Sequence, residues 1–265
     1  MPFEPRLWDS NLITRIDKFL NTINIDEWYK KYDWNNDSWN NGFPDIFELE
    51  MIIGEAVKNK SLTVNHIIKV AKWGGNNRRI ECDGTIDVPI YDGHNIAKWV
   101  EEEPERYIDD ICSHIKYFGP TYGSKLLRFA LPSEYGAIDT RLVRVFGSCD
   151  DFKNCINLLN LKASHQNKEK RWSIAKNKSQ WPSEYGTWIN VLRYIAKQMN
   201  ENDVNCPHPD CFVETKLRDN GLWCCADVEM ALFSYASYFI KTKNKGSANG
   251  CAYESTRKNY SLSNY

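Results

Sequence analysis

Two glycines and a proline stand between apolar segments in the middle of the chain, at Gly119, Pro120 and Gly123. Apolar residues recur at helical spacing over residues 108–118 and again after Gly123, and Pro132 ends the later segment. The pattern predicts a helix, a tight hairpin and a second helix, because glycine and proline favour turn geometry. Such a hairpin directs backbone N–H groups outward beside the positive end of the second helix, and therefore predicts a phosphate-binding turn.

An acidic residue follows this predicted hairpin. Asp139 precedes Leu142, Val143 and Phe146, whose spacing predicts a third helix with one apolar face. A carboxylate at the start of a helix commonly caps it by accepting backbone N–H bonds. The same position also brings a negative charge close to the predicted phosphate-binding turn. The residue types therefore leave a structural role and a chemical role open.

The segment from residue 117 to residue 146 resembles the helix-hairpin-helix superfamily of DNA glycosylases, the group that includes endonuclease III, MutY and the 8-oxoguanine glycosylases. The family hairpin Leu-Pro-Gly-Val-Gly-x-Lys corresponds here to Pro120-Thr121-Tyr122-Gly123-Ser124-Lys125. The family segment Val-Asp-Thr-His-Val-x-Arg corresponds to Ile138-Asp139-Thr140-Arg141-Leu142-Val143-Arg144. Thr121 replaces the first family glycine, and the interval between Lys125 and Asp139 is about one helical turn shorter than in endonuclease III.

The resemblance implies an all-α, mainly helical fold in which the active site lies between two lobes. We therefore expect a single two-lobed domain over residues 1–240, followed by a mobile polar tail over residues 241–265. The central lobe is expected at about residues 60–160, with the hairpin at 117–131. The second lobe is expected to combine the N-terminal and C-terminal helices.

The resemblance also assigns roles to individual side chains. Lys125 and Asp139 correspond to the catalytic lysine and aspartate of the family, although a contact to phosphate is an alternative role for Lys125. Phe129 lies where the family can line its base pocket, and a place in the core is the alternative. The residues expected to bind the DNA backbone are Gly119, Thr121, Gly123 and Ser124.

A polar turn follows the helix that is predicted to begin at Thr63. Asn76, Asn77 and Arg78 in this turn resemble the Asn-Asn-x-x-Arg-Ile turn of the eukaryotic 8-oxoguanine glycosylases. In that branch the turn enters the duplex and fills the gap left by an extruded base. We therefore expect these three residues to insert into DNA, with an ordinary exposed loop as the alternative.

These assignments predict a DNA glycosylase that flips a modified or damaged base out of the duplex and hydrolyses its N-glycosidic bond. Water activated by Asp139 would leave an abasic site, whereas a neutral Lys125 amine would form a Schiff base and add AP lyase activity. The expected role is base excision repair of an oxidised base such as 8-oxoguanine, or anti-phage defence through excision of glucosylated hydroxymethylcytosine. The alternatives are a non-catalytic helix-hairpin-helix DNA-binding protein and an all-helical protein unrelated to nucleic acid.

The composition predicts a cytoplasmic protein, and its near-neutral charge does not by itself indicate binding of nucleic acid. The chain has 265 residues and a formal net charge of −1, so binding of double-stranded DNA would require a local basic face. No apolar run is long enough to cross a membrane, and the N-terminus lacks the layout of a signal peptide. We expect a cytoplasmic monomer that binds double-stranded DNA and no membrane.

Nine cysteines in such a chain are expected to be free thiols, core residues or metal ligands rather than disulfides. Cys206, His208, Cys211 and one of Cys224 or Cys225 can be arranged as a zinc site, but their spacing matches no standard zinc pattern. We therefore expect no cofactor, with a structural zinc at Cys206, His208 and Cys211 as the alternative.

Overall fold

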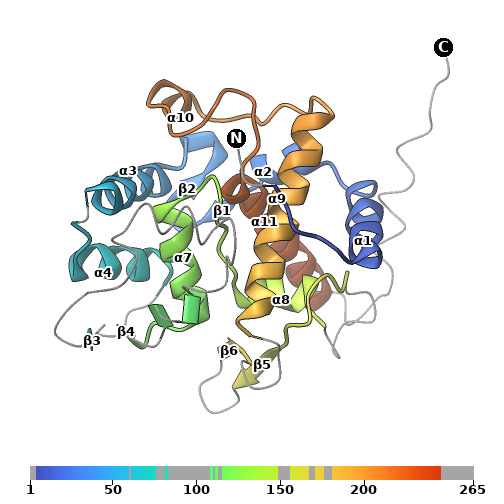
Figure 1. Cartoon of the computed structure of the whole chain (residues 1–265), viewed down its shortest axis with the longest axis horizontal. Helices are drawn as coiled ribbons and strands as arrows, with labels where there is room; N and C mark the ends of the chain where they lie inside the picture. Colours follow the sequence, from blue (N-terminus) through green and yellow to red (C-terminus); the bar gives the residue numbers. More distant parts are fainter. Residues whose placement is uncertain are drawn as a thin grey trace.

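The computed structural model describes residues 4–59, 61–75, 81–82, 108–109, 111–112, 115–148, 156–166, 171–175 and 181–245. Over these residues the protein is mainly helical, which confirms the predicted fold class at that level (Figure 1). The strands pair as short antiparallel ladders: β1 (Asp33–Trp34) with β2 (Asp37–Ser38), β3 (Glu81–Cys82) with β4 (Ile115–Lys116), and β5 (Ala163–Gln166) with β6 (Arg171–Ile174).

The N-terminal helices begin at residues that favour helix starts. The elements are α1 (Ser10–Leu20), α2 (Ile25–Lys30), the 3-10 helix η1 (Trp39–Asn41), α3 (Pro44–Lys58) and α4 (Val64–Trp73). The Asp9 carboxylate caps α1 by accepting the Asn11 N–H at 2.9 Å, and Pro44 starts α3. Thr63 is the N-cap of α4, and His66 completes the cap because its Nδ1 accepts the Thr63 N–H at 3.0 Å.

The remaining helices are α7 (Pro120–Ala130), α8 (Thr140–Phe146), α9 (Ser183–Glu201), α10 (Asp210–Glu214) and α11 (Cys225–Lys245). Apolar residues at helical spacing over residues 184–199 and 226–239 predict helices there, and α9 and α11 confirm both. α11 continues past residue 241, where the polar tail was expected to begin. Residues 246–265, the rest of that predicted tail, lie outside the described residues.

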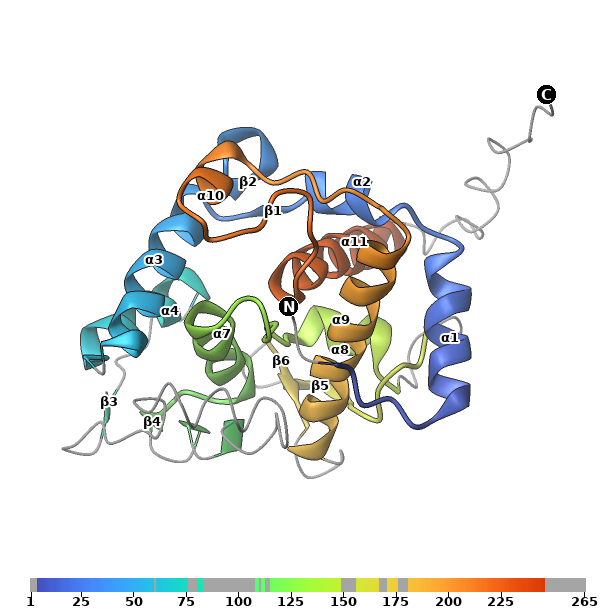
Figure 2. The same ribbon diagram turned by 45° about the horizontal axis from the view of Figure 1, so that its top comes forward.

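The helices form two groups that meet at the connection between α7 and α8. α3, α4 and α7 pack against one another, whereas α11 packs mainly on α2, α8 and α9. Figure 2 shows the first group on one side of the molecule and α1, α8 and α9 on the other, with the α7–α8 connection running between them. Lys125 in α7 and Asp139 at the start of α8 are therefore close in the sequence but belong to different groups of helices.

Two buried links hold the groups together. The Ser124 hydroxyl in α7 accepts the backbone N–H of Ile138 at 3.0 Å, which fixes the chain immediately before α8. Glu50 in α3 accepts Arg218 Nη1 at 2.7 Å and Nη2 at 2.9 Å, and Arg218 Nε lies 3.0 Å from both carboxylate oxygens of Asp227 in α11. These four side chains are at most 6% exposed, so the links lie inside the core.

Candidate active site

The central motif does not form the predicted hairpin between Gly119 and Gly123. Gly119 is the N-cap of α7, and Pro120 occupies the first helical position, where its missing N–H costs nothing. Tyr122 and Gly123 both donate backbone N–H bonds to the carbonyl of Gly119, at 2.9 and 3.0 Å. The glycines therefore bracket the first turn of a helix. The helix predicted over residues 108–118 also ends early, because Ile115–Lys116 is a strand.

Burial removes two of the four predicted DNA-backbone residues from the surface. A Cβ at Gly123 would lie 2.9 Å from Cys112 Sγ, so this glycine permits close packing onto the preceding segment. Ser124 is fully buried, and its hydroxyl bonds to Ile138 as described above. Gly119 and Thr121 lie at the partly exposed N-terminal end of α7. In this conformation Gly123 and Ser124 position the site instead of contacting DNA.

Lys125 lies one residue further along α7 and is only 5% exposed. Burial lowers the pKa of its ammonium group from the ordinary value of 10.5, because a charged amine is poorly solvated inside a protein. The negative charges of Asp139 and Glu229 act in the opposite direction and raise this pKa. The guanidinium groups of Arg141 and Arg128 lower the pKa further. Lys125 thus stands among charges that come from α7, α8 and α11.

Two tryptophan rings face the lysine ammonium. Nζ of Lys125 lies 5.0 Å from the Trp73 ring centroid and 5.7 Å from that of Trp34. Among the described residues, Nζ contacts these two rings and forms neither a hydrogen bond nor an ion pair. Each ring is held in place: Trp73 Nε1 donates to Asp37 Oδ2 at 2.7 Å, and Trp34 Nε1 donates to the carbonyl of Trp73 at 3.1 Å. The amine therefore sits in a rigid aromatic setting.

Asp139 caps α8. Its Oδ1 accepts the backbone N–H groups of Arg141 at 2.8 Å and Leu142 at 3.0 Å. Its other oxygen, Oδ2, accepts no hydrogen bond from the residues that the structure describes, and the side chain is partly exposed. The helix cap thus fixes the orientation of the carboxylate while one oxygen is left for another partner. The structural and chemical roles proposed for this residue are compatible.

Glu229 in α11 is a site residue that no sequence motif indicates. It is 6% exposed, and burial raises its pKa to about 7, against the smaller opposing effects of Arg128 and Lys125. Its Oε2 lies 3.9 Å from Arg128 Nε. A carboxyl group with this pKa exchanges its proton near neutral pH. The signal available in the sequence was an acidic residue two positions after Asp227, between the apolar residues Val228 and Met230.

Arg141 adds a cation next to the tryptophans. Its guanidinium carbon lies 4.7 Å from the Trp34 ring centroid and 5.0 Å from that of Phe233. The side chain is partly exposed, so it borders the buried amine on the side of α8. A fixed cation there attracts an anion such as a phosphate.

Phe129, expected in the base pocket or in the core, is fully buried in the core. Its ring packs edge-on against Trp73, with 4.9 Å between centroids. Phe129 therefore supports the tryptophan that faces Lys125, and the core alternative holds. Asn76, Asn77 and Arg78, the predicted insertion turn, lie outside the described residues.

The cysteine-rich segment places a different set of ligands together from the one expected. One ligand atom each from Cys206, His208 and Asp227 lies within 4.8 Å of the others, a grouping that can hold a metal ion. Cys211, assigned to the alternative zinc site, is not part of this group. Its Sγ lies 3.9 Å from the carbonyl of Gly42 instead. The reason is that α10 turns Cys211 toward the start of α3, away from Cys206.

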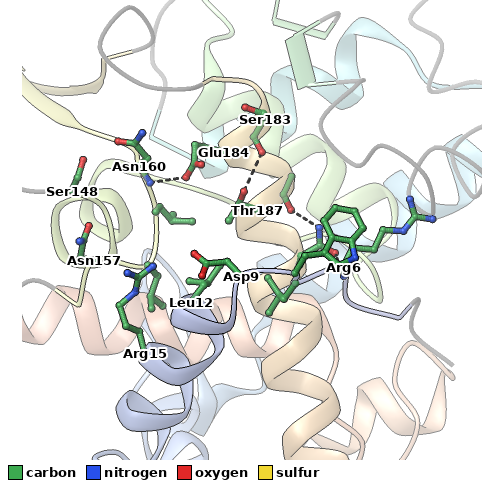
Figure 3. Close-up of a pocket in the computed structure, with 16 residues that line it drawn as sticks. Arg6, Asp9, Leu12, Arg15, Ser148, Asn157, Asn160, Ser183, Glu184 and Thr187 are labelled. Carbon is green, nitrogen blue, oxygen red and sulfur yellow. Dashed lines mark hydrogen bonds between the residues drawn. The ribbon is translucent and has the colours of Figure 1, made fainter.

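A separate pocket of about 780 Å³ lies between the N-terminal segment, α1 and the first turns of α9 (Figure 3). Neither Lys125 nor Asp139 lines it. Its lining carries both signs of charge, from Arg6 and Arg15 and from Asp9 and Glu184. The Glu184 carboxylate accepts the Asn160 N–H at 2.6 Å, so it is engaged within the protein. This pocket is therefore separate from the candidate active site around Lys125 and Asp139.

Comparisons with protein-family models, with curated proteins and with solved structures found no match to this chain. None of the helices in the described residues combines the length and the apolar character that a membrane crossing requires. Any functional conclusion therefore rests on the side chains around Lys125.

Proposed function

We propose that this protein is a two-lobed, helical DNA glycosylase that releases a modified base from double-stranded DNA. The observation that carries the proposal is the buried Lys125 amine, whose pKa is lowered, which faces two tryptophan rings and which interacts electrostatically with Asp139. A lysine with only a structural role would be expected to be paired or exposed. An amine with a lowered pKa in a rigid site is the arrangement that nucleophilic catalysis by lysine requires.

The site offers what a flipped base would need. Trp34 and Trp73 supply aromatic faces beside the amine, and unstacked bases bind to such faces. Arg141 supplies a cation for the phosphate of the flipped nucleotide. The partly exposed N-terminus of α7, at Gly119 and Thr121, is a second place where a phosphate can accept backbone N–H groups.

The proposed reaction uses the lone pair of Lys125. In the neutral form, Nζ attacks C1′ of the deoxyribose while the bond between C1′ and the base breaks. The base leaves with the electrons of that bond and takes up a proton. Loss of a proton from Nζ and opening of the sugar ring then give an imine between Lys125 and C1′. Water hydrolyses the imine, or a β-elimination cleaves the strand first.

Asp139 supports this step electrostatically. The sugar becomes positively charged as the base departs, and the free Oδ2 would stabilise that charge. The cap on α8 keeps the carboxylate oriented, because Oδ1 is held by two backbone N–H groups. If the lysine does not attack, the same carboxylate would activate water, and the product would be a simple abasic site.

A non-catalytic helix-hairpin-helix DNA-binding module receives less support. Such a module needs an exposed hairpin with backbone N–H groups directed at phosphates. Gly123 and Ser124 are instead buried in α7, where the first-turn N–H groups of Tyr122 and Gly123 bond to the carbonyl of Gly119. A DNA-binding module also has no use for a desolvated lysine in its core.

The test is base release from labelled duplexes, each with one modified base, followed by alkaline cleavage of abasic sites. The panel includes 8-oxoguanine and glucosylated hydroxymethylcytosine, which separates repair from anti-phage defence. We expect release of one of these bases by the wild type and a loss of about 10²–10⁴-fold in Asp139→Asn. Asp9→Asn is the matched control, because Asp9 also caps a helix with its carboxylate, and it should retain full activity. Equal loss in both variants, or no release of any base, would contradict the proposal.

Covalent trapping with borohydride tests the role of the lysine. Reduction should link the wild-type protein to DNA, and Lys125→Met should abolish the adduct. Lys72→Met provides the control, because Lys72 is an exposed lysine in the last turn of α4. Base release without a wild-type adduct would assign the attack to water under Asp139.

A further inference from the structure

A second group of reactive side chains lies where the loop after α9 meets the first turn of α11. Cys206 and Asp227 are each 1% exposed, and His208 is partly buried. One ligand atom from each of these residues lies within 4.8 Å of the others. Cys206 belongs to an isolated bridge with Gly221, whereas Asp227 belongs to α11. The group therefore joins a loop of little regular structure to a central helix.

The hydrogen bonds of His208 orient it as a ligand. Its Nε2 lies 2.8 Å from the carbonyl oxygen of Leu222, and because a carbonyl only accepts, Nε2 carries the proton. Nδ1 of the neutral ring is therefore the unprotonated nitrogen, and it faces Cys206 Sγ at 3.6 Å. Histidines that bind metals commonly donate their other N–H to a carbonyl, which fixes the tautomer in this way.

Cys224 and Arg218 lie beside Asp227. The Cys224 thiol is 3.0 Å from Asp227 Oδ2 and 3.3 Å from the carbonyl oxygen of Pro132, next to the three ligand atoms that lie within 4.8 Å of one another. Nε of Arg218 lies 3.0 Å from both Asp227 oxygens, so the carboxylate is held in a fixed orientation. Ligating carboxylates are typically hydrogen-bonded in this manner. Two thiolates and one carboxylate around a divalent ion leave a single negative charge, and the Arg218 guanidinium, which is shared with Glu50, lies next to it.

We propose that Cys206, His208 and Asp227 bind one structural Zn²⁺ ion, and that the Cys224 thiolate turns from the Pro132 carbonyl to become the fourth ligand. Two sulfurs, one imidazole nitrogen and one carboxylate oxygen make four ligands of the types that zinc prefers in tetrahedral sites. On binding, the two thiols release their protons to solvent. The ion would fasten the loop between α9 and α11 to the first turn of α11, the helix that carries Glu229.

The first test is the zinc content of the full chain after purification and after reconstitution with Zn²⁺, measured by elemental mass spectrometry. We expect about one zinc ion per chain in the wild type and nearly none in Cys206→Ser or His208→Gln. Cys211→Ser is the matched control and should keep the zinc, because Cys211 faces Gly42 on another element. Zinc content that is independent of Cys206, or no zinc after reconstitution, overturns the proposal.

Three further measurements use the wild-type protein and therefore do not depend on whether a variant folds. Co²⁺ in place of zinc should give the visible absorption of a tetrahedral site and the near-ultraviolet charge-transfer band expected for two thiolates. A band of the intensity expected for one thiolate overturns the assignment of Cys224. A chelator should lower the thermal midpoint of the wild type. A disulfide between Cys206 and Cys224, detected by the mass of the unreduced protein, would overturn the site, since a disulfide cannot supply thiolates.

Discussion

Arg218 and Lys125 are both buried cations, at 6% and 5% exposure, yet their surroundings differ in kind. Each nitrogen of the Arg218 guanidinium bonds to a carboxylate of Glu50 or Asp227, at 2.7–3.0 Å. Nζ of Lys125 has no hydrogen bond within the described residues, and faces two aromatic rings instead. Arg218 is therefore fully paired, whereas Lys125 has no polar partner for Nζ in the part of the chain that the structure describes.

This difference separates a structural group from a functional one. A buried charge without hydrogen bonds destabilises the folded state, whereas a bidentate arginine pair offsets much of its desolvation. Asp139 could have been drawn into an ion pair with Lys125, but its Oδ1 is engaged as the cap of α8. We infer that Lys125 is kept reactive at a cost in stability, which the structure around Arg218 helps to offset.

The largest effect is expected from breaking the paired cation. Arg218→Ala leaves Asp227 buried without its cation and Glu50 with Arg128 alone, and should lower the free energy of unfolding by about 3–5 kcal/mol in urea titrations. Lys69→Ala is the control, because the Lys69–Glu48 ion pair at 3.2 Å is exposed and should contribute about 0.5 kcal/mol or less. Similar losses in the two variants would remove the contrast between a buried and an exposed pair.

A smaller effect is expected where α7 holds the segment before α8. Ser124→Ala leaves the buried N–H of Ile138 without an acceptor and should lower the free energy of unfolding by about 1–3 kcal/mol. Base release should fall as well, because the adjacent Asp139 loses its fixed position. Ser234→Ala is the matched control: this buried hydroxyl only bonds back to the Met230 carbonyl within α11. Unchanged activity in Ser124→Ala would show that Asp139 needs no such support.

Removal of the unpaired cation should stabilise the protein. Lys125→Met keeps the length of the side chain and should raise the free energy of unfolding by about 1 kcal/mol at neutral pH, while it abolishes trapping. The folded-state pKa of Lys125 lies below 10.5, so the unfolded chain binds more protons between these values and the wild type gains stability as pH rises. The advantage of Lys125→Met should therefore shrink toward pH 10.5. A loss of stability at neutral pH would mean that the ammonium is well accommodated.

The smallest expected effect comes from changing the charged groups that act on the pKa of Lys125. Asp139 and Glu229 raise its pKa, whereas Arg128 and Arg141 lower it. Glu229→Gln removes one negative charge, so the amine should become neutral, and the adduct should form, at lower pH than in the wild type. Because the pKa of Glu229 is about 7, this shift should be visible mainly above neutral pH.

Trapping rates measured across the pH range check this shift. Glu48→Gln serves as the control, since Glu48 is exposed on α3. An unchanged profile in Glu229→Gln would place Glu229 outside the electrostatic neighbourhood of the amine.

Much of the secondary structure could be predicted because its causes are local. Apolar residues at helical spacing predicted α4, α9 and α11, and Asp139 was expected at the start of a helix, where it is the cap of α8. The hairpin at Gly119 was wrong because proline after glycine suits a turn and a helix start equally well. Contacts with residues outside this segment decide between a turn and a helix start: Cys112 packs directly against Gly123, and Ser124 bonds to Ile138.

The setting of the candidate site could not be predicted in the same way. Trp34, Trp73 and Glu229 belong to three separate parts of the chain, and none of them stands in a recognisable motif. The residues next to Lys125 in the sequence do not indicate that its side chain is buried. Its lowered pKa depends on the exclusion of water by side chains that the chain brings together only on folding.

The sequence by itself determined where the helices form and which lysine and aspartate stand close along the chain, because helix formation and capping depend on neighbours a few residues apart. Only the tertiary structure decided that this lysine is buried without a hydrogen bond while Arg218 is fully paired. Desolvation and charge pairing depend on distances through space, and those are set when α3, α7, α8 and α11 pack against one another.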